Sequence, residues 1–423
     1  MERKLKVLLL GYHDSKLTGH IQYEYMNMPA YVEAYMVSYL GCYGKKKYNF
    51  HRQLQSPYAA MIHSKLEKLY KQIYSLVFFH CVPRVDEIYR ASVFIDFEFF
   101  PVSAKRILRK CPKNFIPDVI SIHWDRGFAN SRVVRELYEL TGAKIVFHFV
   151  DEAPLTGGCH YPINCNNYLS GCKSCPALKT GKKLAEKQYA YKNKNLSGLP
   201  LYVCGTPFDM RLASHSPLFK DAITLPVIHK PIVNKVAQVE ARTLYGIDED
   251  CFVIFVGAES IDNPRKGMYY FTKAIEKVSS SIPKLLVLAA GRSELNIPDV
   301  NIMNLGYLDI QQLMTCFCAA DCFVSTTIAD SGPMMVNYSI ALGTPVVAFP
   351  IGVAEDLVVH KKTGYLAKYK DVEDVLNGVL YIHDLDDNDK QIMSDNCVRI
   401  INEKCTKGTW VDLLKAHVNE YKG

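Results

Sequence analysis

Apolar runs and amphipathic segments alternate along most of the chain. In the first half, apolar runs predict strands at 6–12, 118–123, 144–150 and 201–205, and apolar residues recurring once per turn predict helices at 56–79 and 132–140. In the second half, the same patterns predict strands at 251–257, 284–291, 322–325 and 345–349, and helices at 268–278, 310–319 and 334–342. Alternating strands and helices favour parallel sheets covered by helices, so we expect an α/β fold with two Rossmann-like halves.

The length of 423 residues exceeds what one hydrophobic core usually serves, so two domains are expected. The pattern places an N-terminal domain at 1–225, a hinge at 226–240 and a C-terminal domain at 241–385. The remaining residues, 386–423, read as helices that pack back on the N-terminal domain.

Composition and charge narrow the class of protein. No apolar run approaches the roughly 18 residues of a membrane span, and the first residues lack the apolar core of a signal peptide, so we expect a cytoplasmic protein. The net charge of +7 suits acidic partners such as diphosphates or anionic lipids. Without a groove-reading motif it does not indicate nucleic-acid binding.

The first chemical motif opens the predicted helix 268–278. Gly257 ends a predicted strand, and Asn263-Pro264-Arg265-Lys266-Gly267 leads into the helix. A helix N-terminus offers unpaired N–H groups and partial positive charge, which suit a diphosphate, and Arg265 and Lys266 would add two full charges. A solvated basic loop is the alternative interpretation.

The second motif follows the strand 322–325. It consists of Asp330-Ser331-Gly332-Pro333-Met334, a carboxylate and a glycine turn before a helix, at the strand end where open α/β folds bind ligands. The alternative is that Asp330 only caps the helix.

A cysteine cluster distinguishes the segment 156–178. Four of the fourteen cysteines fall there: Cys159, Cys165, Cys172 and Cys175. The Cys-x-x-Cys step lets two sulfurs face one ion, which favours a structural zinc site, with His160 as a substitute ligand. Two disulfides and four reduced thiols are the alternatives. The basic stretch that follows (Lys179, Lys182, Lys183, Lys187, Lys192 and Lys194) is either solvated surface or a patch for an anionic lipid-diphosphate.

Together these segments resemble family 4 of the retaining glycosyltransferases, which have the GT-B fold. The likeness rests on Lys266-Gly267, on Asp330, and on the run from Ala341 to Ala348 with its Gly-x-Pro-Val-Val-Ala core. Segments 352–358 and 363–366 look like the closing donor loops of that family. In the first half, segments 121–124, 151–161, 204–207 and 216–220, including Thr-Gly-Gly-Cys-His-Tyr, resemble a subgroup of exopolysaccharide and capsule biosynthesis.

The resemblance implies two Rossmann-like domains facing each other across a cleft, with the acceptor on the N-terminal side and the donor on the C-terminal side. It implies retaining transfer of a hexose from a nucleotide-diphosphate sugar to a growing surface polysaccharide or lipid-linked glycan, without a catalytic cofactor. Contact with the inner membrane surface would be peripheral. The cysteine loop would face the acceptor.

The resemblance also assigns residues to roles. The catalytic residues would be Arg265, Lys266 and Asp330. The donor would be bound by Gly257, Gly267, Ser331, Gly332, Pro333, Met334, Tyr338 and Glu355. The acceptor side would contain His123, His148 and Asp151.

Three positions depart from the family pattern. Tyr338 stands where the family has a ribose-binding glutamate, Val150 precedes Asp151 where the subgroup has histidine, and Ala258 replaces an arginine. A catalytically inactive, nucleotide- or glycan-binding scaffold for polysaccharide assembly is therefore the second hypothesis. A nucleotide-sugar epimerase is disfavoured because no Gly-x-Gly-x-x-Gly follows the opening strand.

Overall fold

The computed structural model describes residues 3–11, 28–38, 51–53, 69, 73, 76–77, 84–85, 103–123, 128–332 and 334–420. Most of the helix expected at 56–79 lies outside these residues, and so does Pro333. The chain forms two compact units. The N-terminal unit comprises 1–205, 209–226 and 407–423, and the C-terminal unit comprises 206–208 and 227–406.

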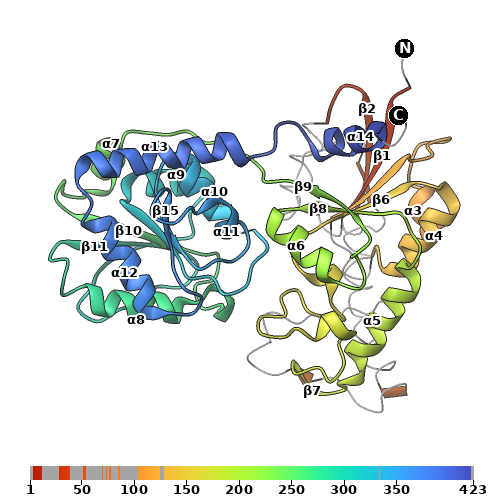
Figure 1. Cartoon of the computed structure of the whole chain (residues 1–423), viewed down its shortest axis with the longest axis horizontal. Coiled ribbons are helices and arrows are strands. Elements are labelled where there is room, and N and C mark those ends of the chain that lie inside the picture. Colours follow the sequence, from red (N-terminus) through yellow and green to blue (C-terminus); the bar gives the residue numbers. More distant parts are fainter. Residues whose placement is uncertain are drawn as a thin grey trace. The chain divides into compact units, whose positions relative to one another are not determined.

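A seven-stranded parallel sheet is the centre of the N-terminal unit, in the order β3-β2-β1-β5-β6-β8-β9 (Figure 1). Its strands are β1 (Leu5–Gly11), β2 (Val32–Ser38), β3 (His51–Gln53), β5 (Val119–Ile122), β6 (Lys144–His148), β8 (Leu201–Gly205) and β9 (Ile223–Pro226). Alternate side chains point to opposite faces of a sheet. Ile145 and Phe147 of β6 thus enter the main core, which is shared with α3 (Ala104–Leu108), α4 (Ser131–Thr141), α5 (Lys183–Leu196) and α6 (Pro207–His215).

The other face of this sheet is contacted by α14 (Trp410–Glu420), from the end of the chain. Trp410 is 1% exposed and meets the ring of His148 edge-on at 5.0 Å between centroids. Near the start of the same helix, Asp412 accepts a 2.6 Å hydrogen bond from the Tyr31 hydroxyl. Helix α14 is therefore held in the N-terminal unit by an aromatic contact and by a hydrogen bond to a carboxylate.

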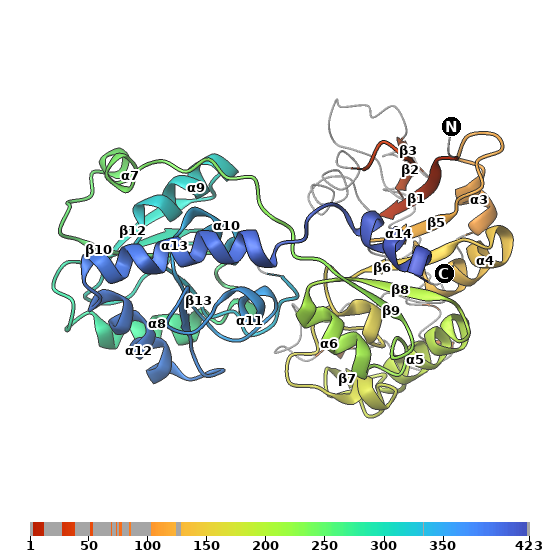
Figure 2. The same cartoon turned by 45° about the horizontal axis from the view of Figure 1, so that its top comes forward.

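The C-terminal unit, which includes β10, β12 and β13 in Figure 2, contains a six-stranded parallel sheet. Its strand order is β12-β11-β10-β13-β14-β15. Its strands are β10 (Phe252–Gly257), β11 (Leu285–Ala290), β12 (Asn301–Gly306), β13 (Cys322–Ser325), β14 (Val346–Ala348) and β15 (Gly364–Leu366). One face packs on α8 (Met268–Val278) and α12 (Val372–His383). The opposite face packs on α7 (Gln238–Tyr245), α9 (Ile310–Ala319), α10 (Met334–Leu342), α11 (Val353–Leu357) and α13 (Asp387–Lys404).

The segment that carries the four clustered cysteines has little regular structure. It includes η2 (Ala153–Leu155), η3 (Asn167–Ser170) and β7 (Leu178–Thr180), which pairs antiparallel with β4 (Arg84–Val85). Gly157 brings it against α5, because a Cβ at this position would overlap the carbonyl oxygen of Ala185.

The predicted α/β fold with two parallel Rossmann-like halves is confirmed. Helices at 268–278, 310–319 and 334–342 and strands at 201–205 and 322–325 have the predicted bounds, because each has a continuous buried stripe or run. The strand expected at 144–150 ends at His148, and the next residues turn into η2. Among the described residues, no helix is both long and apolar enough to cross a membrane.

Candidate active site

The basic motif lies in a turn that a glycine makes possible. The Asn263 side chain accepts a hydrogen bond from the Arg265 N–H and so caps η4 (Pro264–Lys266). Gly267 then adopts a left-handed conformation, with φ of 64°, where α8 begins. A Cβ at Gly267 would overlap the carbonyl oxygen of Thr326, so only glycine lets the turn approach the end of β13. This approach places the two cations beside the loop after β13.

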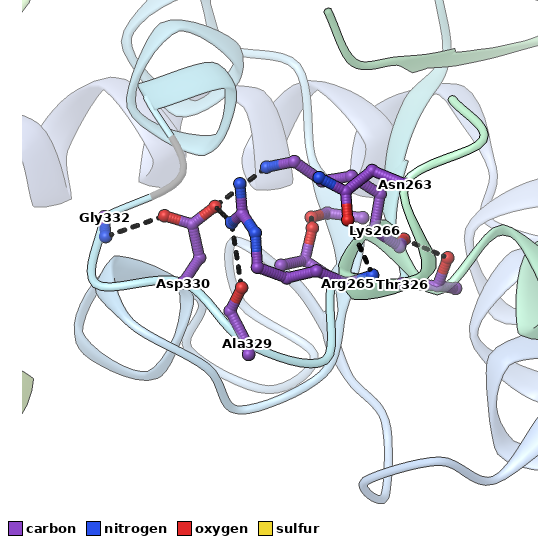
Figure 3. Close-up of polar contacts among 9 residues, drawn as sticks. Asn263, Arg265, Lys266, Thr326, Ala329, Asp330 and Gly332 are labelled. Atoms are coloured by element: carbon purple, nitrogen blue, oxygen red, sulfur yellow. Dashed lines mark hydrogen bonds and ion pairs between the residues drawn. The ribbon is translucent and has the colours of Figure 1, made fainter. Parts of the chain in front are cut away.

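Arg265 and Lys266 both converge on one carboxylate oxygen of Asp330 (Figure 3). The distances to Oδ2 are 2.5 Å from Arg265 Nη1 and 2.8 Å from Lys266 Nζ. Arg265 Nη1 also donates to the carbonyl of Ala329 at 2.9 Å. The three charged side chains are only 11–20% exposed, so water screens them weakly. The site is thus a compact cluster of two positive charges and one negative charge at the carboxyl edge of the sheet.

Asp330 is ionised in this environment. Burial pushes the pKa of its carboxyl upward, but the charges and hydrogen bonds of Lys266 and Arg265 outweigh burial and hold the pKa below its usual value. A carboxylate in this state accepts hydrogen bonds, for example from the hydroxyl groups of a sugar. It also partly neutralises the two cations beside it.

Glycines also shape the loop after Asp330. The Gly332 N–H donates to Asp330 Oδ1 at 3.3 Å, so the loop turns back on its own carboxylate. Gly352, with φ of 57°, lies against the backbone of Asp330 and Ser331, and a Cβ there would come within 2.7 Å of both carbonyl oxygens. A Cβ on Gly257 would lie 3.1 Å from the Met335 side chain, so the first turn of α10 lies close to the end of β10.

The remaining predicted donor-binding residues have different surroundings. Ser331 is 2% exposed, whereas Met334 is 43% exposed at the start of α10. Tyr338 packs partly against the core of the C-terminal unit, and burial raises the pKa of its phenol. Glu355 lies exposed in the first turn of α11. A cavity of about 500 Å³ adjoins the same glycine turn and is lined by Asn263, Gly267, Met268 and Tyr270, but not by the charged cluster itself.

The predicted acceptor-side histidines lie together in the N-terminal unit. His123 and His148 stack with their ring centroids 4.0 Å apart, and both are nearly fully buried. The Ser121 hydroxyl lies 3.0 Å from His123 Nε2. With Asp151 these histidines line a small cavity at the carboxyl ends of β5 and β6. Trp410 packs on His148; the sequence placed helices from the end of the chain on this domain but did not indicate this ring contact.

Asp151 has a partner that the sequence did not indicate. Its Oδ2 lies 2.6 Å from His160 Nδ1, and its Oδ1 accepts the N–H of Ala153 at 2.8 Å. The Glu152 N–H also donates to the His160 carbonyl, so backbone and side chain both hold His160 here. His160, expected as a substitute metal ligand, directs its Nδ1 at the carboxylate of Asp151.

The four clustered cysteines line one pocket in the N-terminal unit, and all four are free thiols. No three of their sulfurs lie within 4.8 Å of one another. Burial raises the pKa of Cys172 to about 11, although the Gly157 N–H and the Lys192 ammonium oppose the rise. Lys192 is 5% exposed and donates to backbone carbonyls, so it is not part of a basic surface patch.

Two parallel Rossmann-like sheets, the second with a charged cluster at its carboxyl edge, define the GT-B class of fold. Sucrose-phosphate synthase from Thermosynechococcus elongatus has this fold (TM-score 0.65, 13% identity, covering 99% of this chain and 98% of that one). So does HepE from Anabaena in complex with UDP (TM-score 0.54, 12% identity, covering 99% of each chain). A glycosyltransferase from Rickettsia africae is also similar (TM-score 0.56, 11% identity, covering 100% of this chain and 98% of that one). At such identities the likeness concerns the fold alone.

The sequence itself identifies the domain that holds the charged cluster. Residues 251–384 match the family model described as Glycosyl transferases group 1, which assigns a group 1 glycosyltransferase domain to this part of the chain. The matched range contains Arg265, Lys266 and Asp330. A search of the curated proteins finds no match.

Proposed function

We propose that this protein is a retaining glycosyltransferase that transfers a hexose from a nucleotide-diphosphate sugar to a growing surface polysaccharide or lipid-linked glycan. The observation that carries the proposal is the convergence of Arg265 and Lys266 on Asp330 within the group 1 domain. Two cations held together in a weakly screened place suit a diphosphate leaving group. The C-terminal unit would bind the donor and the N-terminal unit the acceptor.

The chemistry follows from where charge develops during transfer. When the glycosidic bond of the donor breaks, negative charge grows on the oxygens of the leaving diphosphate. Arg265 and Lys266, held in place before reaction, would stabilise this charge, an effect typically worth several kcal/mol. Asp330, kept ionised by the same cations, would accept hydrogen bonds from the sugar. No step of this scheme uses a metal ion.

The donor is proposed to carry uridine. HepE, which shares the fold, has been solved with UDP, with UDP and glucose, and with UDP-glucose. The donor pocket would be completed by Gly257, the backbone of 331–334, Tyr338 and Glu355. Tyr338 would replace a carboxylate, which costs about 1.5–3 kcal/mol of donor binding if a charged hydrogen bond is lost.

On the acceptor side, His123, His148 and Asp151 surround the cavity at the ends of β5 and β6. Because both oxygens of Asp151 are engaged by Ala153 and His160, Asp151 would act by positioning His160. We propose a cytoplasmic protein with peripheral contact to the inner membrane surface, where a lipid-linked acceptor would be presented. The exposed lysines Lys183 and Lys187 of α5 would assist this contact.

The test is release of nucleoside diphosphate from a panel of UDP-, GDP- and ADP-sugars. We expect release from a UDP-sugar by the unaltered protein and at least about a hundredfold slower release by Lys266→Ala, the scale of losing one preorganised donor. Lys277→Ala is the matched control, because Lys277 is an exposed lysine of α8 in the same unit. Equal rates for both variants would refute the assigned role of Lys266.

The second candidate function is a nucleotide- or glycan-binding scaffold without catalysis. Tyr338, in place of the family glutamate, is the observation that favours it. The two functions differ in one measurement. A scaffold would bind UDP, seen as a raised melting temperature, yet release none from any UDP-sugar in the presence of a glycan acceptor extract. The intact ion cluster around Asp330 favours the enzyme.

A further inference from the structure

Four cysteine side chains meet at one small cavity of the N-terminal unit. The cavity measures about 20 Å³, and its lining includes all four clustered cysteines together with Leu184 and Ala185 of α5. A space of this size holds about one water-sized particle. Thr156, Asn167, Tyr168 and Gln188 also line it, but the four sulfurs are the soft metal ligands among the lining groups.

Backbone N–H groups are directed at two of these sulfurs. The Gly157 N–H donates to Cys172 Sγ at 3.1 Å, and the N–H groups of Ala177 and Leu178 donate to the sulfur of Cys175. A neutral thiol gains little from such donors, whereas a thiolate gains a charge-assisted hydrogen bond from each of them. These donors therefore become charge-assisted when a bound metal ion holds the sulfurs as thiolates.

Two lysines supply positive charge at the same place. Lys192 is 5% exposed, and its ammonium donates to the carbonyls of Ala153 and Thr156 at 3.0 Å each while acting electrostatically on Cys172. Lys182 acts in the same way on Cys175. A divalent ion with four thiolates carries two net negative charges. The buried ammonium of Lys192 and the exposed one of Lys182 each act on one of its ligands.

We propose that residues 156–178 form a structural zinc site whose ligands are the sulfurs of Cys159, Cys165, Cys172 and Cys175. Structural zinc sites are tetrahedral, and four thiolates are one of their usual ligand sets. Four protein ligands close the site to substrate, so the role of the ion is to hold the segment together. In the structure no three of the sulfurs lie within 4.8 Å of one another. Binding at about 2.3 Å would draw them together inside the cavity they already share.

Zinc bound to Cys159 would also fix the position of the next residue, His160. His160 follows Cys159 directly and reaches Asp151 through a 2.6 Å contact. Thr156 Oγ1 accepts the Cys159 N–H at 2.8 Å and donates to the Cys159 carbonyl at 2.6 Å, so this ligand is anchored from both sides. Zinc would therefore fix the segment that presents His160 to Asp151. The proposal does not depend on the protein being a glycosyltransferase.

The first experiment measures zinc in the full chain, purified without chelator, by plasma mass spectrometry. About one zinc per chain is expected for the unaltered protein and for Cys111→Ser, a half-buried thiol of the same unit outside the segment. Cys175→Ser should lose most of the zinc. The unaltered protein loaded with Co²⁺ gives a reading that needs no variant, since four thiolates around cobalt produce intense visible absorption and a strong thiolate-to-metal band.

Thiol titration and metal analysis together distinguish the zinc site from its alternatives. Thiol titration in denaturant with chelator should find all fourteen cysteines reduced. Four fewer reactive thiols, together with no metal, would mean two disulfides. All thiols reactive, with no zinc and no cobalt bands, would mean a plain thiol cluster. Iron with inorganic sulfide in place of zinc would also refute the assignment.

Discussion

Replacing Asp330 with asparagine tests the charged cluster more sharply than removing either cation. The carboxylate accepts from Arg265 at 2.5 Å and from Lys266 at 2.8 Å, and its other oxygen accepts from Gly332. Asparagine keeps the shape but has one acceptor oxygen and one donor nitrogen. One of these contacts becomes donor against donor, and two cations are left facing each other without a counter-charge.

The expected loss of stability follows from the burial of the cluster. Removing one partner of a buried ion pair costs about 3–5 kcal/mol. The three side chains are 11–20% exposed, and asparagine retains one acceptor oxygen. We therefore expect Asp330→Asn to lower the free energy of unfolding by about 2–3 kcal/mol. The assay is urea unfolding at pH 7, followed by circular dichroism, because the C-terminal unit contains no tryptophan.

The same substitution should strengthen the binding of nucleoside diphosphate. In the unaltered protein Asp330 partly neutralises the cations that a diphosphate would contact, and its own charge repels the ligand. At an effective dielectric constant near 20, two unit charges 4 Å apart interact by about 4 kcal/mol, and even a third of this is a tenfold change in affinity. We therefore expect UDP to bind about tenfold more tightly to Asp330→Asn by calorimetry, while sugar transfer falls.

The control is Asp321→Asn in the same unit. Asp321 accepts from Arg242 at 2.8 Å and from the Val253 N–H at 2.7 Å, a comparable buried pair between different elements. Burial raises the pKa of Asp321, whereas the cations lower that of Asp330, so Asp321→Asn should cost less stability and leave UDP affinity unchanged. The reasoning is refuted if Asp330→Asn unfolds within about 0.5 kcal/mol of the unaltered protein, the scale of an ordinary surface substitution. It is also refuted if UDP binds Asp330→Asn no more tightly than Asp321→Asn.

Three further outcomes are expected. Folding lowers the pKa of Asp330, so its contribution to the free energy of unfolding is complete above the unfolded-state pKa near 4. This contribution is lost as the pH falls through the lower folded-state pKa. The difference in stability between the unaltered protein and Asp330→Asn should therefore close below about pH 4, as measured by urea unfolding. Trp410→Ala should cost about 3–5 kcal/mol and release α14 to proteolysis, with His148 more exposed to chemical modification; unchanged cleavage would contradict the packing described. Gly267→Ala should reduce stability by more than about 1 kcal/mol and weaken UDP binding, whereas Gly246→Ala, also left-handed but in open space, should cost only about 1 kcal/mol and leave binding unchanged.

Much of the fold could be predicted because it depends on local patterns. Continuous apolar runs mark strands buried on both faces, and a buried stripe once per turn marks the covering helices, so the α10 helix and the β8 strand have the bounds the sequence predicted. The strand at Lys144 was predicted too long, because Phe149 and Val150 are as apolar as the strand but belong to the turn before η2.

For the candidate site, the sequence by itself singled out Arg265 and Lys266 at a glycine turn and Asp330 after a strand. Basic and acidic residues at strand-to-helix turns indicate a ligand-binding site from the sequence alone. Only the tertiary structure decided that both cations share one carboxylate oxygen, since that depends on how close Gly267 lets two loops approach. It also decided that Lys192, one lysine among many in the sequence, is buried beside a thiol, and that His160 faces Asp151. Burial and pairing between distant residues are set by packing, which the local pattern does not encode.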